Sequence, residues 1–266
     1  MWFFAPFALF GTMGLLGVAS LILTLGPILD RLRSLPNPPA RSDFGLIVLA
    51  LAQPTILVLL TIMAGVLLAD RVGLRSHLLA WTRGLSLPAR FGSGVPMAIV
   101  LAIVVGTAII MLDLVFKEIT DPGSVGRLGA ASGPPNWTVR ASAILYGGIT
   151  EELMMRFGLM TLLVWLASLV FPGALTCHPG LPIGAAIVIS ALLFGLGHLP
   201  QLFASTRPST ALILHIVVLN TLAGLVYGWL YWRHSLEHAM LAHALTHLTF
   251  WTVTPVLLQV GAALTK

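Results

Sequence analysis

Charged residues are scarce in this chain. Asp, Glu, Lys and Arg make up 9% of its 266 residues, whereas about 25% is usual in soluble domains. Hydrophobic residues make up 58%, and the mean hydropathy is +0.98. A soluble fold of this size could not cover its surface with so few charges, so lipid must form part of its solvent. We therefore expect an integral, multi-pass protein of the cell (inner) membrane.

Cysteine is nearly absent, and so are the marks of a secreted or modular protein. Cys177 is the only cysteine, which excludes an internal disulfide. The sequence contains no low-complexity segment, internal repeat or soluble domain. The opening residues MWFFAPFALF lack a basic region and lead into a long apolar run. They predict a first spanning helix rather than a cleaved signal peptide.

The basic residues do not indicate nucleic-acid binding, although the net charge is +5. They lie mostly in short loops beside apolar runs, where the positive-inside pattern of membrane proteins explains them. We expect membrane lipid as a partner and no nucleic acid. The sequence gives no sign of the oligomeric state.

Long apolar runs predict an all-α bundle of about seven or eight spanning helices, since about 20 residues cross the hydrocarbon core. Residues 69–92 mix arginines with Leu and Trp, which is typical of an amphipathic surface segment. We divide the chain into N-terminal membrane helices, 1–138, and a C-terminal helix core, 139–260. The expected spans are residues 4–29, 44–68, 95–116, 139–170, 181–199, 210–232 and 238–264.

The stretch Tyr146–Gly158, YGGITEELMMRFG, places three charges in an apolar run. Each charge costs roughly 2.5–3.5 kcal/mol at the bilayer centre, so the group needs partners. Glu152 precedes Arg156 by four residues, the favourable order for a helical ion pair. Glu151 is then left over, and a desolvated carboxylate can act as a general base. The alternatives are a structural ion network and a proton path.

Histidines mark two later spans. His198 ends the run FGLGH, in which Gly195 and Gly197 would let a neighbouring helix approach closely. Taken alone, His198 also fits an ordinary residue at the membrane interface. His243 and His247 are four residues apart and share one face of the last span. Such a pair can ligate a metal or donate two hydrogen bonds to an oxyanion.

Taken together, the three motifs resemble the CPBP family of intramembrane peptidases. This family is related to the CAAX-processing endopeptidases and is also called the abortive-infection family. The motifs read EELMMR (151–156), FGLGH (194–198) and HALTH (243–247), each on its own hydrophobic helix. The resemblance covers about residues 139–260, which we therefore take as a catalytic helix core. It implies an intramembrane endopeptidase, a hydrolase acting on a membrane-associated peptide or protein.

The resemblance also implies roles for the residues of the first two motifs. Glu151 matches the catalytic glutamate, which activates the attacking water together with the histidine matching His198. Glu152 and Arg156 match the rest of the first motif, and Phe194 opens the second. We expect these three residues to support the site.

The third motif departs from the family pattern. His243 matches the histidine that holds the oxyanion with a following asparagine, but this chain has His247 in place of that asparagine. Histidine can still donate a hydrogen bond, so we expect the oxyanion role to persist. An inactive relative is the alternative. We favour catalysis without a metal or other cofactor; a zinc enzyme would use His198, His243 and His247 as ligands, with Glu151 as base or fourth ligand.

Two other classes of function fit parts of this pattern. Intramembrane Glu, Arg and His also mark the proton relays of coupled transporters, but the sequence lacks repeated halves with paired broken helices. A non-catalytic binding or immunity protein would use a polar cavity among the helices to recognise a peptide or a partner. A proteolysis assay separates the enzyme from the binder, and ion flux tests the transporter.

Some polar and small residues lie outside the three motifs. We expect Asp113 to pair with Lys117, four residues further on. His215 and Asn220 either line the cavity or form hydrogen bonds between helices. The GxxxG spacing of Gly224–Gly228 predicts close helix packing.

Overall fold

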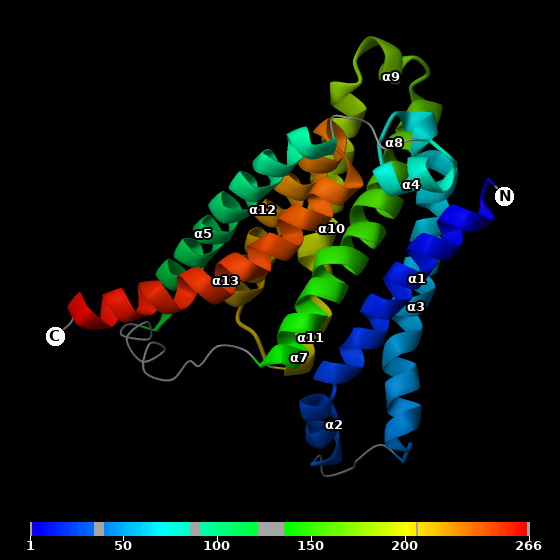
Figure 1. Ribbon diagram of the computed structural model, residues 1–266. Coiled ribbons are helices and arrows are strands. Elements are labelled where there is room, and N and C mark those ends of the chain that lie inside the picture. Colours follow the sequence, from blue (N-terminus) through cyan, green and yellow to red (C-terminus); the bar gives the residue numbers. More distant parts are fainter. Residues whose placement is uncertain (1, 35–39, 86–90, 122–135, 206, 265–266) are drawn as a thin grey trace.

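Seven helices in the described residues are long and apolar enough to cross a membrane. The structure is a computed structural model that describes residues 2–34, 40–85, 91–121, 136–205 and 207–264. Within these ranges the chain is almost entirely helical and forms no strand (Figure 1). The all-α, multi-pass bundle is thus confirmed. Its candidate spans are Phe4–Thr24, Asp43–Leu68, Gly92–Thr120, Trp137–Val170, Gly180–Phe203, Thr210–Arg233 and Leu236–Val260.

The chain contains both long helices and short helical elements. The long helices are α1 (Phe4–Ser20), α3 (Asp43–Leu68), α5 (Val95–Thr120), α10 (Gly180–Gly197), α12 (Thr210–Arg233) and α13 (Leu236–Leu264). The short elements are η1 (Leu21–Thr24), α2 (Gly26–Arg33), η2 (Asp70–Val72), α4 (His77–Thr82), η3 (Phe91–Gly94), α9 (Ala174–Cys177) and α11 (Leu199–Ser205). The fourth span consists of α7 (Trp137–Ser142), η4 (Ala143–Glu151), η5 (Leu153–Met160) and α8 (Thr161–Val170).

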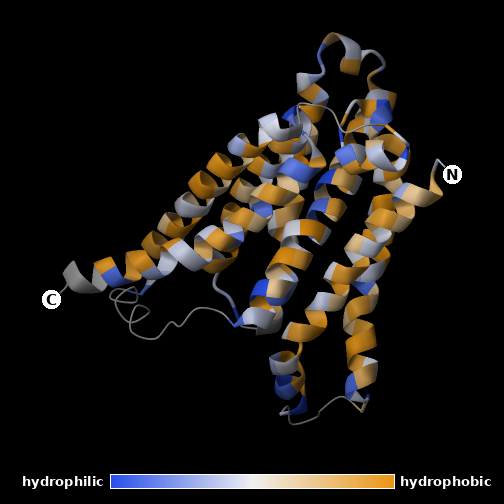
Figure 2. Cartoon of the chain, viewed as in Figure 1, coloured by the Kyte–Doolittle hydropathy of each residue, from blue (hydrophilic) through white to orange (hydrophobic). Residues whose placement is uncertain are grey.

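Apolar side chains cover the outside of the bundle. Figure 2 shows hydrophobic residues along the lengths of the helices and hydrophilic ones gathered toward several helix ends. Large side chains such as Leu49 on α3 and Val104 on α5 are each 58% exposed. In water, contiguous patches of this kind would mark interaction sites or aggregation hazards. Along spanning helices they are the surface that faces lipid.

The fourth span lies at the centre of the helices. Its η4 segment packs against α1 and α13, and η5 packs against α3, α10 and α12. Both segments are π-helices, whose backbone hydrogen bonds reach back five residues instead of four. The hydroxyls of Thr150 and Thr161 reach back five residues too, to the carbonyls of Leu145 (3.2 Å) and Arg156 (3.3 Å). The sequence did not reveal this, because hydropathy does not distinguish a π-helix from an α-helix.

Small residues allow close contacts between α10 and α12. A methyl group added at Gly224 would lie 2.9 Å from the Cα atom of Ala191, so the close packing expected of Gly224–Gly228 is confirmed. One added at Gly195 would lie 2.6 Å from the carbonyl oxygen of Val217. Gly197, in contrast, has no atom within 4 Å of that position, so our expectation for this glycine is wrong. It is exposed at the end of α10.

The segment 69–92 forms short helical turns and no span in its described part; residues 86–90 lie outside the described ranges. A carboxylate anchors it to the start of α13. Glu237 accepts hydrogen bonds from the Ser76 hydroxyl (2.6 Å) and from the amides of His77 and Leu78 (both 3.0 Å). These amides open α4, where a negative charge is favourable.

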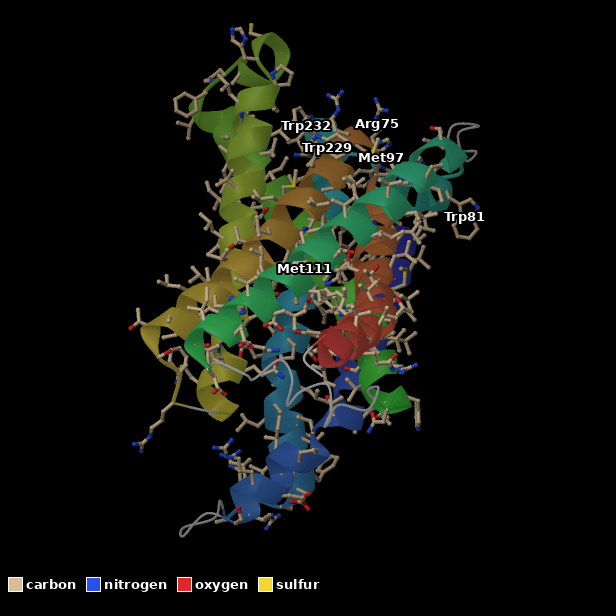
Figure 3. The ribbon with its side chains drawn as sticks, turned by 90° about the vertical axis from the view of Figure 1, so that its left-hand side faces the viewer. Arg75, Trp81, Met97, Met111, Trp229 and Trp232 are labelled. Atoms are coloured by element: carbon tan, nitrogen blue, oxygen red, sulfur yellow. The ribbon has the colours of Figure 1, made fainter. Side chains whose placement is uncertain are left out.

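Aromatic residues mark the same end of the bundle. Figure 3 shows Arg75, Trp81, Trp229 and Trp232 there, with Met111 about halfway along α5. Trp81 is 58% exposed. Tryptophan beside arginine is typical of the membrane–water interface, so this end fits one boundary of the bilayer.

Candidate active site

A buried ion pair lies within the π-helical segments. Arg156 Nη1 is 3.1 Å from Glu152 Oε1, and both side chains are completely buried. Arg156 Nη2 also donates a hydrogen bond to the Gly224 carbonyl, at 3.1 Å. The predicted Glu152–Arg156 pair is therefore confirmed. Removing one partner of a buried pair typically costs about 3–5 kcal/mol, because the other charge is left uncompensated.

Glu152 also holds a histidine of the last span. His243 Nδ1–H donates a hydrogen bond of 2.8 Å to Glu152 Oε1. This bond fixes the ring, so that its other nitrogen, Nε2, faces Glu151 Oε2 at 4.0 Å. That separation is longer than a hydrogen bond. A carboxylate that orients an imidazole in this way sets which ring nitrogen is free to act.

The second histidine of the HALTH motif faces the same place. The His243 and His247 rings are stacked, with centroids 5.1 Å apart. A methyl group at Gly147 would lie 2.7 Å from His247 Nε2 and 3.7 Å from His243 Nε2. His247 Nε2 is buried and has no hydrogen-bond partner among the described residues. Gly147 therefore leaves room beside two imidazole nitrogens, a role that sequence reasoning did not assign to it.

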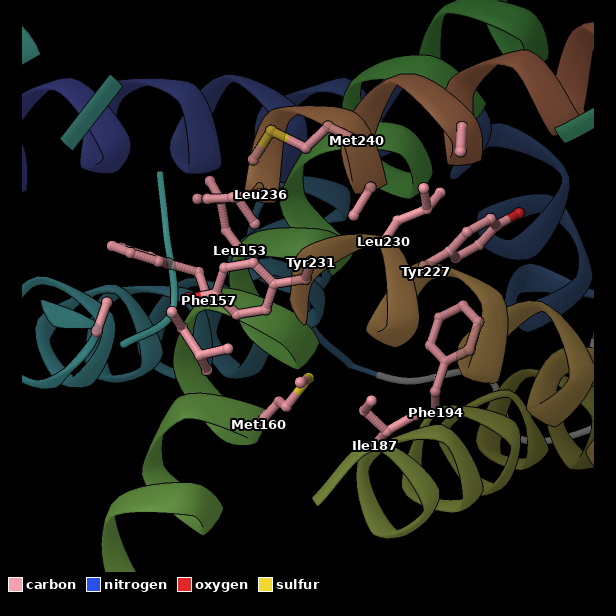
Figure 4. Close-up of a cluster of buried hydrophobic side chains, with 14 of the residues drawn as sticks. Leu153, Phe157, Met160, Ile187, Phe194, Tyr227, Leu230, Tyr231, Leu236 and Met240 are labelled. Carbon is pink, nitrogen blue, oxygen red and sulfur yellow. The ribbon is translucent and has the colours of Figure 1, made fainter. Parts of the chain in front are cut away.

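Aromatic rings enclose the ion pair and His243. Tyr227 stacks on His243 with ring centroids 4.6 Å apart, and Phe194 meets His243 edge to face at 5.9 Å. The Arg156 guanidinium lies 4.7 Å from the Phe194 ring centre and 5.3 Å from that of Tyr227. Figure 4 shows these two rings within the buried cluster. Phe194 thus lies in the site, as expected, while Tyr227 is a neighbour that the motifs did not reveal.

His198 lies at the rim of this cluster, at the end of α10. Its Nδ1–H donates to the Phe194 carbonyl at 2.8 Å. Its ring meets the Phe194 ring edge to face at 4.9 Å, so one phenyl ring touches both His198 and His243. With Nδ1 bound to a carbonyl, a neutral His198 has its lone pair on Nε2. The residues predicted from all three motifs therefore converge.

Comparison with known proteins also indicates a resemblance to the CAAX-type peptidases. Residues 134–249 match the family model described as "Type II CAAX prenyl endopeptidase Rce1-like". This segment is therefore similar to the Rce1-like domain. The match contains all three motifs and confirms the resemblance to the CPBP family. No curated protein and no solved structure matches the chain. The match to this family model implies a protease, a hydrolase, in a chain with seven candidate membrane spans.

The positions of the three histidines bear on the zinc alternative. Among the described residues, no group of three or more His, Cys, Asp or Glu side chains is placed to hold a metal ion. The hydrogen bond from His243 Nδ1 to Glu152 leaves Nε2 free, as in many metal-binding histidines. Metal dependence therefore stays a prediction.

A second polar group lies away from the site, between α5 and α12. Lys117 Nζ donates to Asp113 Oδ2 at 2.5 Å, which confirms the expected pair. His215 Nε2–H donates to Asp113 Oδ1 at 3.0 Å, so this histidine forms a bond between helices. Asn220 instead donates to the Ile216 carbonyl of its own helix at 2.8 Å.

Proposed function

We propose that this protein is an intramembrane endopeptidase of the cell (inner) membrane, which hydrolyses a peptide bond in a membrane-associated peptide or protein. One observation carries the proposal. Glu151 Oε2 faces His243 Nε2, and the Nε2 atoms of His243 and His247 both lie beside Gly147. Hydrolysis needs a base for water and a donor for the oxyanion. The three groups supply both.

Glu151 acts as the general base in this mechanism. It takes a proton from water, and the water oxygen attacks the scissile carbonyl carbon. His198 assists Glu151, as the family resemblance implies. His243 takes a different role from the oxyanion donor that the resemblance implies. Its Nδ1–H is bound to Glu152, so a neutral ring has a lone pair at Nε2 and accepts a hydrogen bond from the same water.

His247 stabilises the tetrahedral intermediate. Its buried Nε2, which has no hydrogen-bond partner in the described part of the chain, donates a hydrogen bond to the oxyanion. The intermediate then collapses, the carbon–nitrogen bond breaks, and Glu151 returns its proton to the leaving amine. No step requires a metal ion or another cofactor.

A proteolysis assay tests this function. Purified protein in liposomes is incubated with a membrane-anchored peptide library, and the products are identified by mass spectrometry. We expect cleavage by the native protein and by Asp43→Ala, which changes an exposed carboxylate paired with Arg33. Glu151→Ala should lose about 10²–10⁴-fold in rate, the usual contribution of a general base.

The same preparation separates the competing functions. Unchanged cleavage by Glu151→Ala would rule out the proposed base. Tight peptide binding without cleavage by the native protein would indicate a binding protein. Proton-coupled flux into the liposomes, abolished by Glu151→Ala, would indicate a transporter.

A further inference from the structure

One stripe of α13 connects the candidate site to a cavity. His243, His247, Phe250, Thr254 and Leu258 follow one another at spacings of three or four residues. Side chains with this spacing lie on one face of a helix. The first two belong to the candidate active site, and the last three line a cavity of about 250 Å³ between α5, α12 and α13. Phe250 stands between the two, because its ring meets that of His247 edge to face at 5.9 Å.

The walls of the cavity are largely apolar. Ile109, Ile110 and Leu114 line it from α5, and Leu219 lines it from α12. The charged residues in the wall, Asp113 and Lys117, are paired with each other.

The cavity offers no uncompensated charge to an occupant. Asp113 Oδ2 accepts from Lys117 Nζ at 2.5 Å, and Asp113 Oδ1 accepts from His215 Nε2 at 3.0 Å. A carboxylate or ammonium group entering the cavity would lose its hydration without gaining a free counter-charge. An apolar group has no hydrogen bonds with water to lose on entry, and it gains van der Waals contacts with the apolar walls. The chemistry of the cavity therefore selects an apolar occupant.

The distance along α13 indicates which part of a substrate could reach the cavity. Seven residues separate His247 from Thr254, or about 10 Å at about 1.5 Å per helical residue. An extended peptide covers this distance in about three residues. A peptide whose scissile bond lies at His247 would therefore bring a side chain about three positions away to Thr254.

We propose that this cavity is a specificity subsite, which receives a large apolar side chain of the substrate about three residues from the scissile bond. The proposal rests on the peptidase function above. Phe250 separates the subsite from His247, so the side chain enters past its ring. Peptides with Leu, Met or Phe at that position are preferred over those with Ala, Asp or Lys.

A cavity-filling variant tests the subsite. Thr254→Phe places a ring in the cavity, and Val256→Phe is its matched control, since Val256 is on the same helix and 56% exposed. Each protein is assayed with peptides that vary from Leu to Ala at positions two to four on either side of the cleaved bond. Thr254→Phe should lower kcat/KM for one Leu peptide about tenfold or more, mainly through KM. The matching Ala peptide should be cleaved as before, and Val256→Phe should keep the native preference.

The outcomes distinguish this proposal from the function on which it rests. If the native protein cleaves and Thr254→Phe keeps its side-chain preference, the subsite is wrong and the peptidase stands. If the folded native protein cleaves none of the peptides, the peptidase function is wrong and the subsite falls with it. If Thr254→Phe instead displaces a co-purified lipid without changing the preference, the cavity is a lipid site.

Discussion

Two groups of side chains in this bundle have nearly the same composition but opposite surroundings. Each joins an acidic and a basic residue, four apart on one helix, to a histidine from another helix. The first group is Glu152, Arg156 and His243, and the second is Asp113, Lys117 and His215. In the first group both charged side chains are fully buried, whereas in the second the acidic and basic side chains are 32% and 42% exposed.

Burial gives the two groups different roles. An exposed ion pair contributes about 0–1 kcal/mol, so the Asp113–Lys117 pair adds little to the stability of the bundle. A buried pair is stable only when complete, which fixes Glu152 and Arg156 in one geometry. Because Glu152 is held in place, its 2.8 Å hydrogen bond to His243 also fixes the orientation of the His243 ring. An acidic residue, a basic residue and a histidine thus form a rigid support in one place, while in the other the acidic and basic residues line a cavity.

The largest expected difference between the groups is in stability. Arg156→Ala leaves Glu152 buried without its counter-charge and should lower the free energy of unfolding by about 3–5 kcal/mol. Lys117→Ala, the equivalent change in the exposed pair, should lower it by no more than about 1 kcal/mol. Denaturant unfolding in detergent micelles measures both. Equal losses would contradict the contrast between the two groups.

The next largest effect is on the chemistry beside the buried group. His247→Ala removes the proposed oxyanion donor and should reduce kcat about 10²–10³-fold. His247→Asn keeps a donor at that position and should recover most of this loss. Cleavage rates at saturating peptide test the pair of variants. An Ala variant as fast as the native protein would exclude His247 from the mechanism.

A smaller loss should follow from filling the space beside the histidines. Gly147→Ala places a methyl group 2.7 Å from His247 Nε2, so the ring must move. Displacement of a catalytic group by about 1 Å can cost about 10²-fold in rate. Gly184→Ala is the control, since nothing lies within 4 Å of its added methyl group. If both variants cleave equally well, the space beside Gly147 is not where the reaction occurs.

Removing metal ions should have no effect, because the proposed mechanism uses no metal ion. We expect the purified protein to keep its cleavage rate after dialysis against a chelator, with no stoichiometric zinc by elemental analysis. Lost activity that returns with zinc would require the histidines to rearrange into a ligand set.

Most of the fold could be predicted from the sequence. Seven apolar runs correspond to seven candidate spans, because length and hydropathy suffice to identify a helix that crosses lipid. The Glu152–Arg156 pair was predictable too, since it depends on a local spacing of four residues. The expectation that the three motifs lie close together came from the resemblance to a family and not from the spacing of residues along the chain.

Features that depend on contacts between distant segments could not be read from the sequence. The Glu152–His243 hydrogen bond joins residues 91 apart. The role of Gly147 depends on how closely α13 crosses η4, and the outward position of Gly197 depends on where α12 lies. The π-helical turns follow from backbone geometry, which side-chain hydropathy does not encode.

The central claim is that the buried group presents His243 to a base, Glu151. Its most direct test is the single-turnover rate of peptide cleavage by Glu151→Gln, which keeps the shape of the side chain and removes the base. Asp43→Asn, the same chemical change at an exposed carboxylate, is the control. Our account predicts a fall of about 10²–10⁴-fold for Glu151→Gln and none for the control. A Glu151→Gln rate within a few-fold of the native value would contradict it.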